Sequence, residues 1–433
     1  MAEDDDDTAQ SSKEPSEESS EETPEAPLLE LRESLPAVVE TEDALAATCA
    51  AIAGGTGPVA IDAERASGYR YSSRAYLIQL RREGSGIHLV DPIAFETMAP
   101  LQEAIGDAEW ILHAATQDLP CLAEVGLAPA ELFDTELAGR LLGYPRVGLA
   151  ALVESRLGSR MAKEHSAVDW STRPLPEPWL VYAALDVEVL VELRELLGKE
   201  LAEAGKDGWA AEEFDALRGF TPTPRVDAWR RTSGLHRVRG RRSLGAVRAL
   251  YELRDSIASE RDVTPGRILP DAAIVAAASA LPVQRRALLR TQGFHGRGAE
   301  RYAARWTAAL KEVAELPEEE LPTRVPRGDG PPMPRAWAEK DPVAARRLST
   351  ARPALTVLAE EHHLPAENLL TPDFVRRILW TPPATRDPEA LAEAVDERLT
   401  DYGARPWQRD LTTALLVETI LAADVATLPP AEA

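Results

Sequence analysis

Hydrophobic and polar positions divide the 433-residue chain into an early part with strands and helices and a later part with helices alone. Short β-type runs, PVAIDAE, AYLIQLRRE and GIHLVDP, are separated by turn-forming segments and predict adjacent strands. A helical stretch, a strand (EWILHA) and another helix follow, and a long helical run, PWLVYAALDVEVLVELRELLGKEL, ends this part. Strands followed by strand–helix units predict an α/β domain with a mixed sheet over residues 28–215.

The rest of the chain predicts two all-α regions joined by breaker-rich connectors, with no convincing strand. The predicted divisions are a connector at 216–240, a helical domain at 241–320, a second connector at 321–340 and a divergent helical domain at 341–433.

The two helical regions share a faint internal repeat. IASERDVTPGRILP from Ile257 and LAEEHHLPAENLLT from Leu358 align with a constant offset of 101 residues. Each copy predicts a helix, a proline-containing turn and a second helix.

Charge is distributed very unevenly along the chain. The formal net charge is −24, but residues 1–26 hold eleven acids and one lysine and so contribute −10. This composition predicts a disordered acidic tail over residues 1–27. Residues 225–248 instead carry eight arginines and one aspartate, and such a local basic segment could dock a polyanion. A solvated linker is an equally good interpretation of that segment alone.

The cysteine content and the hydropathy of the chain limit the cellular compartments in which we expect the protein. Two cysteines, Cys49 and Cys121, cannot build a disulfide framework, which is typical of a reducing environment. The acidic N-terminus lacks the apolar segment of a secretory signal, and no apolar run is long enough to span a bilayer. We therefore expect a cytoplasmic protein that has no membrane partner.

Carboxylates in contexts that predict burial are the main chemical signal. Asp62 and Glu64 alternate on a predicted strand and so share a face, and Asp118 follows a strand end. Tyr182 and Asp186 lie one turn apart on an otherwise apolar helical stripe. Buried acids are costly to keep ionised unless cations lie among them, so the set is a candidate for metal-assisted phosphodiester hydrolysis.

Each of these signals has an ordinary structural alternative. An Asp-x-Glu pair on a strand is more often a solvated edge, and Asp186 could equally be a buried acid with one hydrogen bond. Asp118 could be an acid favoured by a helix dipole. Only the three segments together point to a catalytic site.

Together the segments IDAE, HAATQDL and YAALD resemble the three motifs of the ribonuclease D family, in the DEDD superfamily of 3′–5′ exonucleases. The spacing of Tyr182 and Asp186 is similar to the tyrosine subclass, since Val181 stands where the histidine subclass would have His. The resemblance extends to LIQL, FDT and KEHSAVDWSTRPL, while LRDSIASERDVTPGRILPD (253–271) resembles an HRDC domain.

The resemblance implies an RNase H-like α/β exonuclease domain followed by two all-α HRDC-type domains. It implies two Mg²⁺ or Mn²⁺ ions and no organic cofactor. Asp62 would contact both ions, Glu64 and Asp186 would complete one site, and Asp118 would serve the other. Tyr182 would orient the attacking water, because a phenol of pKa about 10 is a poor base at neutral pH.

The expected activity is a 3′–5′ exoribonuclease that releases nucleoside 5′-monophosphates from single-stranded 3′ ends of structured RNA such as tRNA precursors. A DNA exonuclease and an inactive nucleic-acid-binding scaffold are the alternatives, and the complete acid set argues against the scaffold. The expected contacts to nucleic acid are Lys163, Trp170, Arg173, Arg239, Arg241 and Arg242. For Trp170, a role as a core anchor is the commoner alternative.

Overall fold

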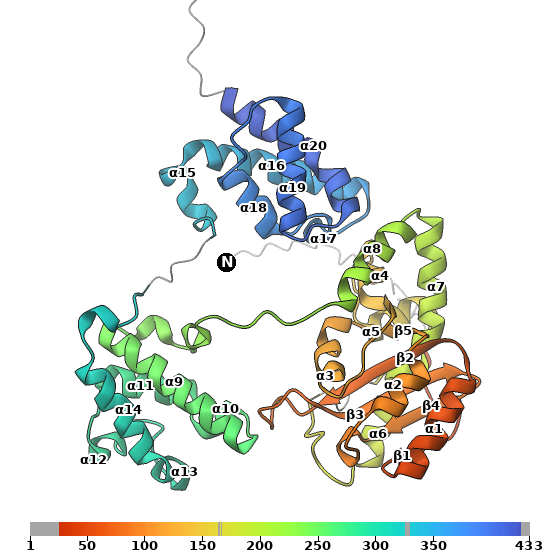
Figure 1. The fold of residues 1–433 in the computed structure, drawn as a ribbon, viewed down its shortest axis with the longest axis horizontal. Helices are drawn as coiled ribbons and strands as arrows, with labels where there is room; N and C mark the ends of the chain where they lie inside the picture. The colour runs from red at the N-terminus through yellow and green to blue at the C-terminus, as the bar shows by residue number, and fades with distance from the viewer. Residues whose placement is uncertain (1–25, 163–164, 166, 325–329, 426–433) are drawn as a thin grey trace, which may run out of the picture.

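The computed structural model describes residues 26–162, 165, 167–324 and 330–425. These residues form an α/β domain and two helical bodies, which we call the first helical module (α9–α14) and the C-terminal module (α15–α20) (Figure 1). Most of the predicted acidic tail, part of the second connector and Lys163 lie outside the described residues.

A mixed sheet forms the centre of the α/β domain, in the order β1-β4-β3-β2-β5-β6. The strands β2, β3 and β4 pair antiparallel, as the three adjacent β-type runs predict, and β5 and β6 add in parallel beside β2. The sheet therefore confirms the predicted mixed α/β class. The strands span β1 Val38–Val39, β2 Thr56–Arg65, β3 Ala75–Glu83, β4 Gly86–Val90, β5 Glu109–Leu112 and β6 Glu131–Asp134.

The helices of this domain pack against the sheet, and their buried apolar side chains join those of the strands in shared clusters. They span α1 Glu42–Gly54, α2 Ala99–Ile105, α3 Leu119–Glu124, α4 Thr135–Leu141, α5 Leu149–Leu152, α6 Glu177–Glu188, α7 Leu190–Glu203 and α8 Asp207–Arg218.

The long helical run at the end of the α/β domain is two helices, and the prediction of one helix is wrong. A single turn residue, Val189 (φ −102°, ψ −11°), separates α6 from α7. Ala183 on α6 packs against side chains of β3 and β4, whereas Leu193 on α7 belongs to a different cluster, shared with the C-terminal module. The break lets each half bury its own apolar face.

The first helical module has a core of its own, made from residues between Trp229 and Leu321. Trp229 and Val238, which the sequence places in the first connector, are buried in this core. Its helices span α9 Arg241–Arg261, α10 Pro265–Ile268, α11 Asp271–Ala280, α12 Arg285–Leu288, α13 Arg297–Arg301 and α14 Ala303–Glu315.

The C-terminal module repeats the turn of the first helical module at the predicted offset. The short helix α10 (Pro265–Ile268) corresponds to α17 (Ala366–Leu369), and both preceding turns contain a left-handed residue, Asp262 (φ 46°) and His363 (φ 50°). The remaining helices span α15 Trp337–Lys340, α16 Pro342–Glu361, α18 Pro372–Trp380, α19 Pro388–Asp401 and α20 Pro406–Val425. The backbone thus supports a repeat that only three identities suggested.

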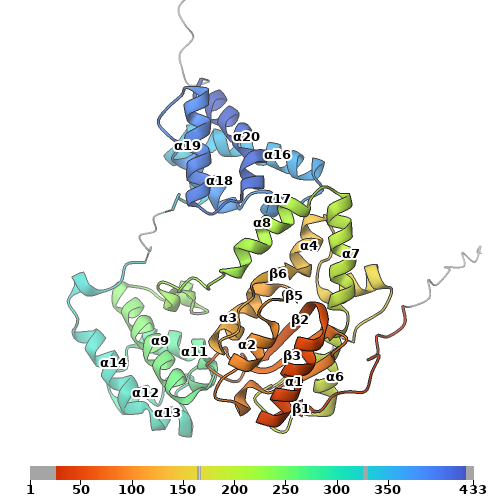
Figure 2. The ribbon, with the colours of Figure 1, turned by 45° about the vertical axis from the view of Figure 1, so that its right-hand side comes forward.

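The C-terminal module and the α/β domain share one hydrophobic cluster. Phe133 and Leu141 of the α/β domain belong to the same buried group as Leu364, Ile378 and Trp407. Figures 1 and 2 both place α17 beside α8. Within the described ranges, no helix is both long and apolar enough to cross a bilayer.

Candidate active site

Two of the predicted acids project from β2, which lies between β3 and β5. Asp62 and Glu64 share one face of the strand, while Ile61 and Ala63 are buried in the core on the other face. Gln79 on β3 lies opposite Asp62 on β2 and donates a hydrogen bond from Nε2 to Asp62 Oδ2 (2.5 Å). Because Gln79 is fully buried, this bond fixes the orientation of the Asp62 carboxylate.

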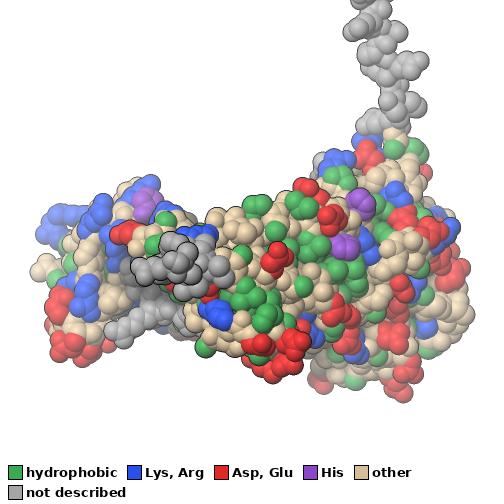
Figure 3. Space-filling view, turned by 90° about the horizontal axis from the view of Figure 1, so that it is seen from above, with side chains coloured by type: hydrophobic (Ala, Val, Ile, Leu, Met, Phe, Trp, Pro, Cys, Tyr) green, Lys and Arg blue, Asp and Glu red, His purple; other side chains and the backbone are tan. Residues whose placement is uncertain are grey.

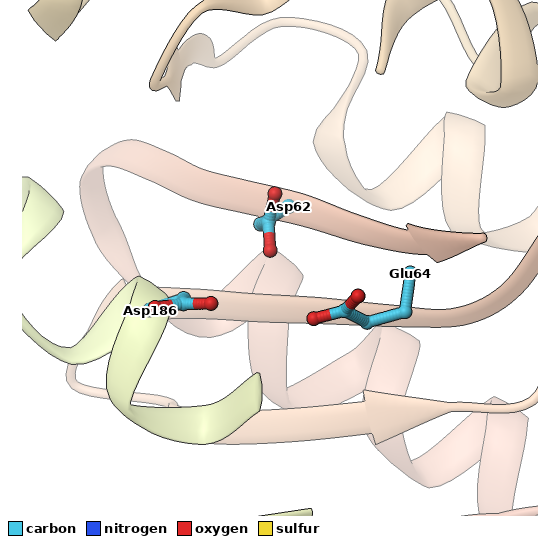
Figure 4. Close-up of side chains that lie close together, drawn as sticks. All are labelled: Asp62, Glu64 and Asp186. Atoms are coloured by element: carbon cyan, nitrogen blue, oxygen red, sulfur yellow. The ribbon is translucent and has the colours of Figure 1, made fainter. Parts of the chain in front are cut away.

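The helix α6 brings Asp186 to the two strand acids. Carboxylate oxygens of Asp62, Glu64 and Asp186 lie within 4.8 Å of one another. Figure 4 shows the three side chains pointing toward a common space between strand and helix. Tyr182 lies one turn before Asp186, close enough for its hydroxyl to lower the pKa of the Asp186 carboxyl against the effect of burial. The structure therefore brings together four of the five residues predicted to be catalytic.

Asp118 is the fifth, and it approaches from the turn between β5 and α3. It is 4 % exposed and forms an ion pair with Arg65 (Oδ1 to Nη2, 3.4 Å). The turn is held by Asp134 at the end of β6, whose carboxylate accepts hydrogen bonds from the backbone N–H groups of Ala114 (3.1 Å) and Ala115 (2.8 Å). Asp118 is outside the group of three but close enough for its charge to act on Glu64.

Burial and mutual repulsion make these acids hard to ionise. Desolvation raises the pKa of Glu64 to about 10, and the charges of Asp62, Asp186 and Asp118 add to the shift. Burial, followed by the charge of Asp62, also raises the pKa of Asp118 and of Asp186. Such a cluster favours the binding of cations, which would stabilise the ionised carboxylates.

The donor set fits hard divalent cations. Every candidate ligand atom is a carboxylate oxygen, the type preferred by Mg²⁺ and Mn²⁺. Among the described residues, no ion pair joins Asp62, Glu64 or Asp186 to a cationic side chain. A bound cation would therefore supply positive charge that no ion pair provides to these three acids.

Comparison with protein-family models matches residues 36–202 to a 3′–5′ exonuclease, 243–310 to an HRDC domain and 330–420 to a 3′ to 5′ exonuclease C-terminal domain. The sequence is 34% identical over 284 residues to ribonuclease D of Gluconacetobacter diazotrophicus, covering 63% of this chain and 71% of that protein. It is 33% identical to ribonuclease D of Acidiphilium cryptum, covering 69% and 77%. The chain belongs to the ribonuclease D family.

Solved structures agree with this assignment. A protein from Bifidobacterium adolescentis is 37% identical and superposes with a TM-score of 0.83, covering 92% of this chain and 100% of that one. Escherichia coli RNase D, described as an exoribonuclease involved in structured RNA processing, is 26% identical with a TM-score of 0.62, covering 84% and 99%. The catalytic core of RRP6 from Trypanosoma brucei shares the fold at 23% identity.

Family membership together with the exonuclease domain makes the chain a 3′–5′ exoribonuclease that acts on RNA. Enzymes of this superfamily depend on divalent metal ions, in agreement with the acidic cluster. The match at 243–310 confirms the predicted HRDC domain in the first helical module.

Two of the predicted contacts to nucleic acid have structural roles instead. Trp170 is 0% exposed, so it cannot stack on a base of the RNA. Arg173 forms two hydrogen bonds to Asp91 (2.6 and 2.9 Å) and donates to the carbonyl oxygens of Tyr76 and Trp170. Its guanidinium is therefore occupied in holding the segment after Trp170 against the sheet.

Arg241 and Arg242 are likewise engaged within the first helical module. Arg242 Nη1 donates to the carbonyl oxygens of Val313 (2.7 Å) and Leu316 (2.9 Å) at the end of α14, and Arg241 donates to Leu321 O. Both arginines cap backbone groups, which argues against their main role being phosphate contact. Lys163 lies outside the described residues.

Other arginines remain exposed on the first helical module. Arg239 forms no ion pair within the described part of the chain, and neither do Arg285, Arg286 and Arg290 around α12. In Figure 3, Lys and Arg side chains (blue) gather at the left-hand end of the molecule. Figure 1 places the first helical module at this end. Sequence reasoning missed the α12 group, although QRRALLR was a visible signal.

Proposed function

We propose that the chain degrades single-stranded 3′ ends of structured RNA, such as tRNA precursors, by a mechanism that uses two divalent ions. The convergence of Asp62, Glu64 and Asp186 within 4.8 Å, with Asp118 beside them, carries this proposal. When bound, the ions would activate the attacking water and stabilise the leaving 3′ oxygen. Hydrolysis would release a nucleoside 5′-monophosphate at each step.

The position of each acid decides which of the two ions we assign to it. Asp62 lies near Glu64 and Asp186, its charge also acts on Asp118, and it is oriented by Gln79, so we assign it to both ions. Glu64 and Asp186 would complete one site, and Asp118 would hold the ion on its own side. These roles require carboxylates fixed by buried neighbours, as observed here.

Tyr182 would orient the attacking water by hydrogen bonding. Burial raises the pKa of Tyr182 well above its usual range, and the charges of Asp186 and Glu64 raise it further. The phenol therefore stays protonated at neutral pH and cannot serve as a general base.

The substrate proposal rests on the family and on the surface charge. The relatives are ribonuclease D enzymes, and the Escherichia coli protein is described as acting in structured RNA processing. The exposed Arg239 and the α12 arginines would bind phosphates of the RNA outside the catalytic site.

The variant Asp62→Asn tests the site. We expect at least about a 10³-fold loss of RNA degradation, because metal stabilisation supplies several kcal/mol and 1.36 kcal/mol is tenfold. Degradation of a 5′-labelled RNA with a single-stranded 3′ end is the measurement, and a matched DNA strand tests sugar preference. Asp43→Asn, an exposed acid on α1, is the control. Degradation that persists in Asp62→Asn would remove the assignment.

A further inference from the structure

Arg65 is the last residue of β2 and follows the metal-site acids directly. The pairing of β2 with β3 shifts register between Glu64 and Arg65, an irregularity that strengthens the local twist of the strands. The side chain of Arg65 is 28% exposed and reaches the turn that carries Asp118. It is therefore at the border between the buried cluster and solvent.

The two terminal nitrogens of Arg65 make different contacts. Nη1 donates a hydrogen bond to the backbone carbonyl of Gln117 (2.5 Å), while Nη2 lies 3.4 Å from Asp118 Oδ1. One nitrogen thus holds the backbone of the turn and the other compensates the charge of its carboxylate. Lysine carries its three donors on one nitrogen instead of this planar fork, so it could not keep both contacts in the same geometry.

The charge of Arg65 also reaches the other acids. It opposes the effect of burial on the pKa of Asp62, Glu64 and Asp118. Among the described residues, Arg65 is the one cation in an ion pair with a member of the acid quartet, Asp62, Glu64, Asp118 and Asp186. A divalent ion that binds Asp118 must therefore compete with a guanidinium already in place.

We infer that Arg65 is a positioning residue and built-in counter-ion, which holds the Asp118 turn through Gln117 and sets the affinity of the ion at Asp118. The inference rests on the proposed role of the acids as metal ligands. Nη1 keeps the turn fixed whether or not an ion is present. Nη2 releases the carboxylate when the ion binds, so the enzyme holds this ion less tightly than an uncompensated quartet would.

Titration of the full-length protein with Mn²⁺, followed by electron paramagnetic resonance of the free ion, tests the inference. In Arg65→Gln we expect the Kd of the weaker Mn²⁺ site to fall by about tenfold or more, because a competing positive charge is removed. In Arg74→Gln the Kd should not change, because Arg74 contacts the Tyr76 ring and none of the acids. An unchanged or weaker Mn²⁺ affinity in Arg65→Gln would overturn the counter-ion role.

Arg65→Lys separates charge from geometry and serves if Arg65→Gln does not fold. It keeps the charge, so Mn²⁺ affinity should stay within about threefold of wild type. It loses the fork, so kcat on RNA should fall about tenfold with KM unchanged. A Lys variant equal to wild type in kcat would overturn the positioning role, and one that binds Mn²⁺ tenfold more tightly would overturn the counter-ion role.

The same titration distinguishes failure of this inference from failure of the proposed function. If the wild-type chain bound no Mn²⁺ and degraded no RNA, the metal site itself would be wrong. If it bound Mn²⁺ and degraded RNA while the Arg65 variants behaved like wild type, only the inference would fail.

Discussion

The two helical modules reach the α/β domain through the same turn of their repeat but are attached to it in different ways. In the first helical module the turn contains Asp262, and in the C-terminal module the corresponding residue is His363. The first attachment consists of polar contacts to a loop, while the second includes a shared hydrophobic core. The two copies of the repeat therefore differ in how they are joined. The first helical module keeps a separate core, and the C-terminal module shares the core of the α/β domain.

The polar attachment involves the loop at residues 66–74 between β2 and β3. Asp262 Oδ1 accepts hydrogen bonds from the backbone N–H groups of Tyr71 (3.2 Å) and Ser72 (3.0 Å). Tyr71 donates from its hydroxyl to Asp255 (2.8 Å), and Thr264 N donates to Tyr69 O (3.1 Å). The core of the first helical module is otherwise its own.

In the apolar attachment, one glycine and one buried lysine of the α/β domain contact the backbone of the C-terminal module. Gly143 of the α/β domain has φ +77°, and a Cβ there would come 2.4 Å from the carbonyl oxygen of His363, so only glycine fits. Lys206 Nζ donates to Leu141 O (2.6 Å) and to His362 O (2.7 Å). The C-terminal module therefore packs directly on the backbone of the catalytic domain.

The aromatic pair Trp209 and Trp407 strengthens this second attachment. Their rings stack with centroids 4.9 Å apart, and Trp407 Nε1 donates to Glu213 (3.1 Å) on α8. Because one core spans both regions, we expect the α/β domain and the C-terminal module to unfold together and the first helical module to unfold separately.

The largest expected effect comes from removing Trp407. Trp407→Ala should cost about 3–5 kcal/mol in the transition that unfolds the α/β domain and C-terminal module. Trp306→Ala, a similarly buried Trp in the core of the first helical module, is the matched control and should destabilise that module alone. Calorimetry with hydrogen exchange assigns the transitions. An α/β domain of unchanged stability in Trp407→Ala would contradict the shared core.

A smaller effect is expected at the polar attachment. Asp262→Ala should weaken docking of the first helical module by about 1–2 kcal/mol, because two backbone donors lose a charged acceptor at a partly exposed site. Hydrogen exchange at residues 66–74 should become about tenfold faster, since about 1.4 kcal/mol corresponds to a factor of ten. Glu315→Ala, an exposed acid on α14 that pairs with Lys311, is the control. Unchanged exchange would show that other contacts hold the module.

The smallest effect is a pH dependence of opposite sign at the two attachments. Burial alone would raise the pKa of Asp262, but hydrogen bonds from Ser72 and Tyr71 and the charge of Arg70 lower it. Its contribution is present above the unfolded value of about 3.9 and is lost as pH falls through the lowered pKa. Burial raises the pKa of Glu213 despite Arg405 and Trp407. Its contribution is complete below about 4.3 and is lost as pH rises.

Acidification from pH 6 through the lowered pKa of Asp262 should therefore weaken docking of the first helical module and leave docking of the C-terminal module unweakened. Single-molecule fluorescence energy transfer between each module and the α/β domain measures this. Asp262→Asn should remove the pH response of the first attachment. Release of the C-terminal module at low pH, ahead of the first, would contradict the opposite signs.

Sequence reasoning succeeded where local pattern sets the answer. The alternation of Asp62 with Glu64 and the helical spacing of Tyr182 and Asp186 fix which side chains share a face within each element, and the family resemblance predicted that these elements meet. It failed for the long helix that Val189 breaks, because burial of two different faces depends on the partners of α6 and α7.

The prediction that Trp170 and Arg173 contact RNA failed for a related reason, because their partners in the fold lie far away in the sequence. A tryptophan and an arginine in a polar segment are consistent with stacking and charge, yet one is fully buried and the other bonds to Asp91. Composition does not show where side chains end up, since that depends on the arrangement of distant segments.

The sequence by itself determined the fold class and the repeat of 101 residues, since each depends on local period or spacing, and its resemblance to the family picked out the four acids and the tyrosine. Only the tertiary structure decided that Arg65 holds Asp118, that Gln79 orients Asp62, and that one module shares a core while the other is held by polar contacts. These contacts join residues far apart in the chain, and their energies depend on distance and burial that no local pattern contains.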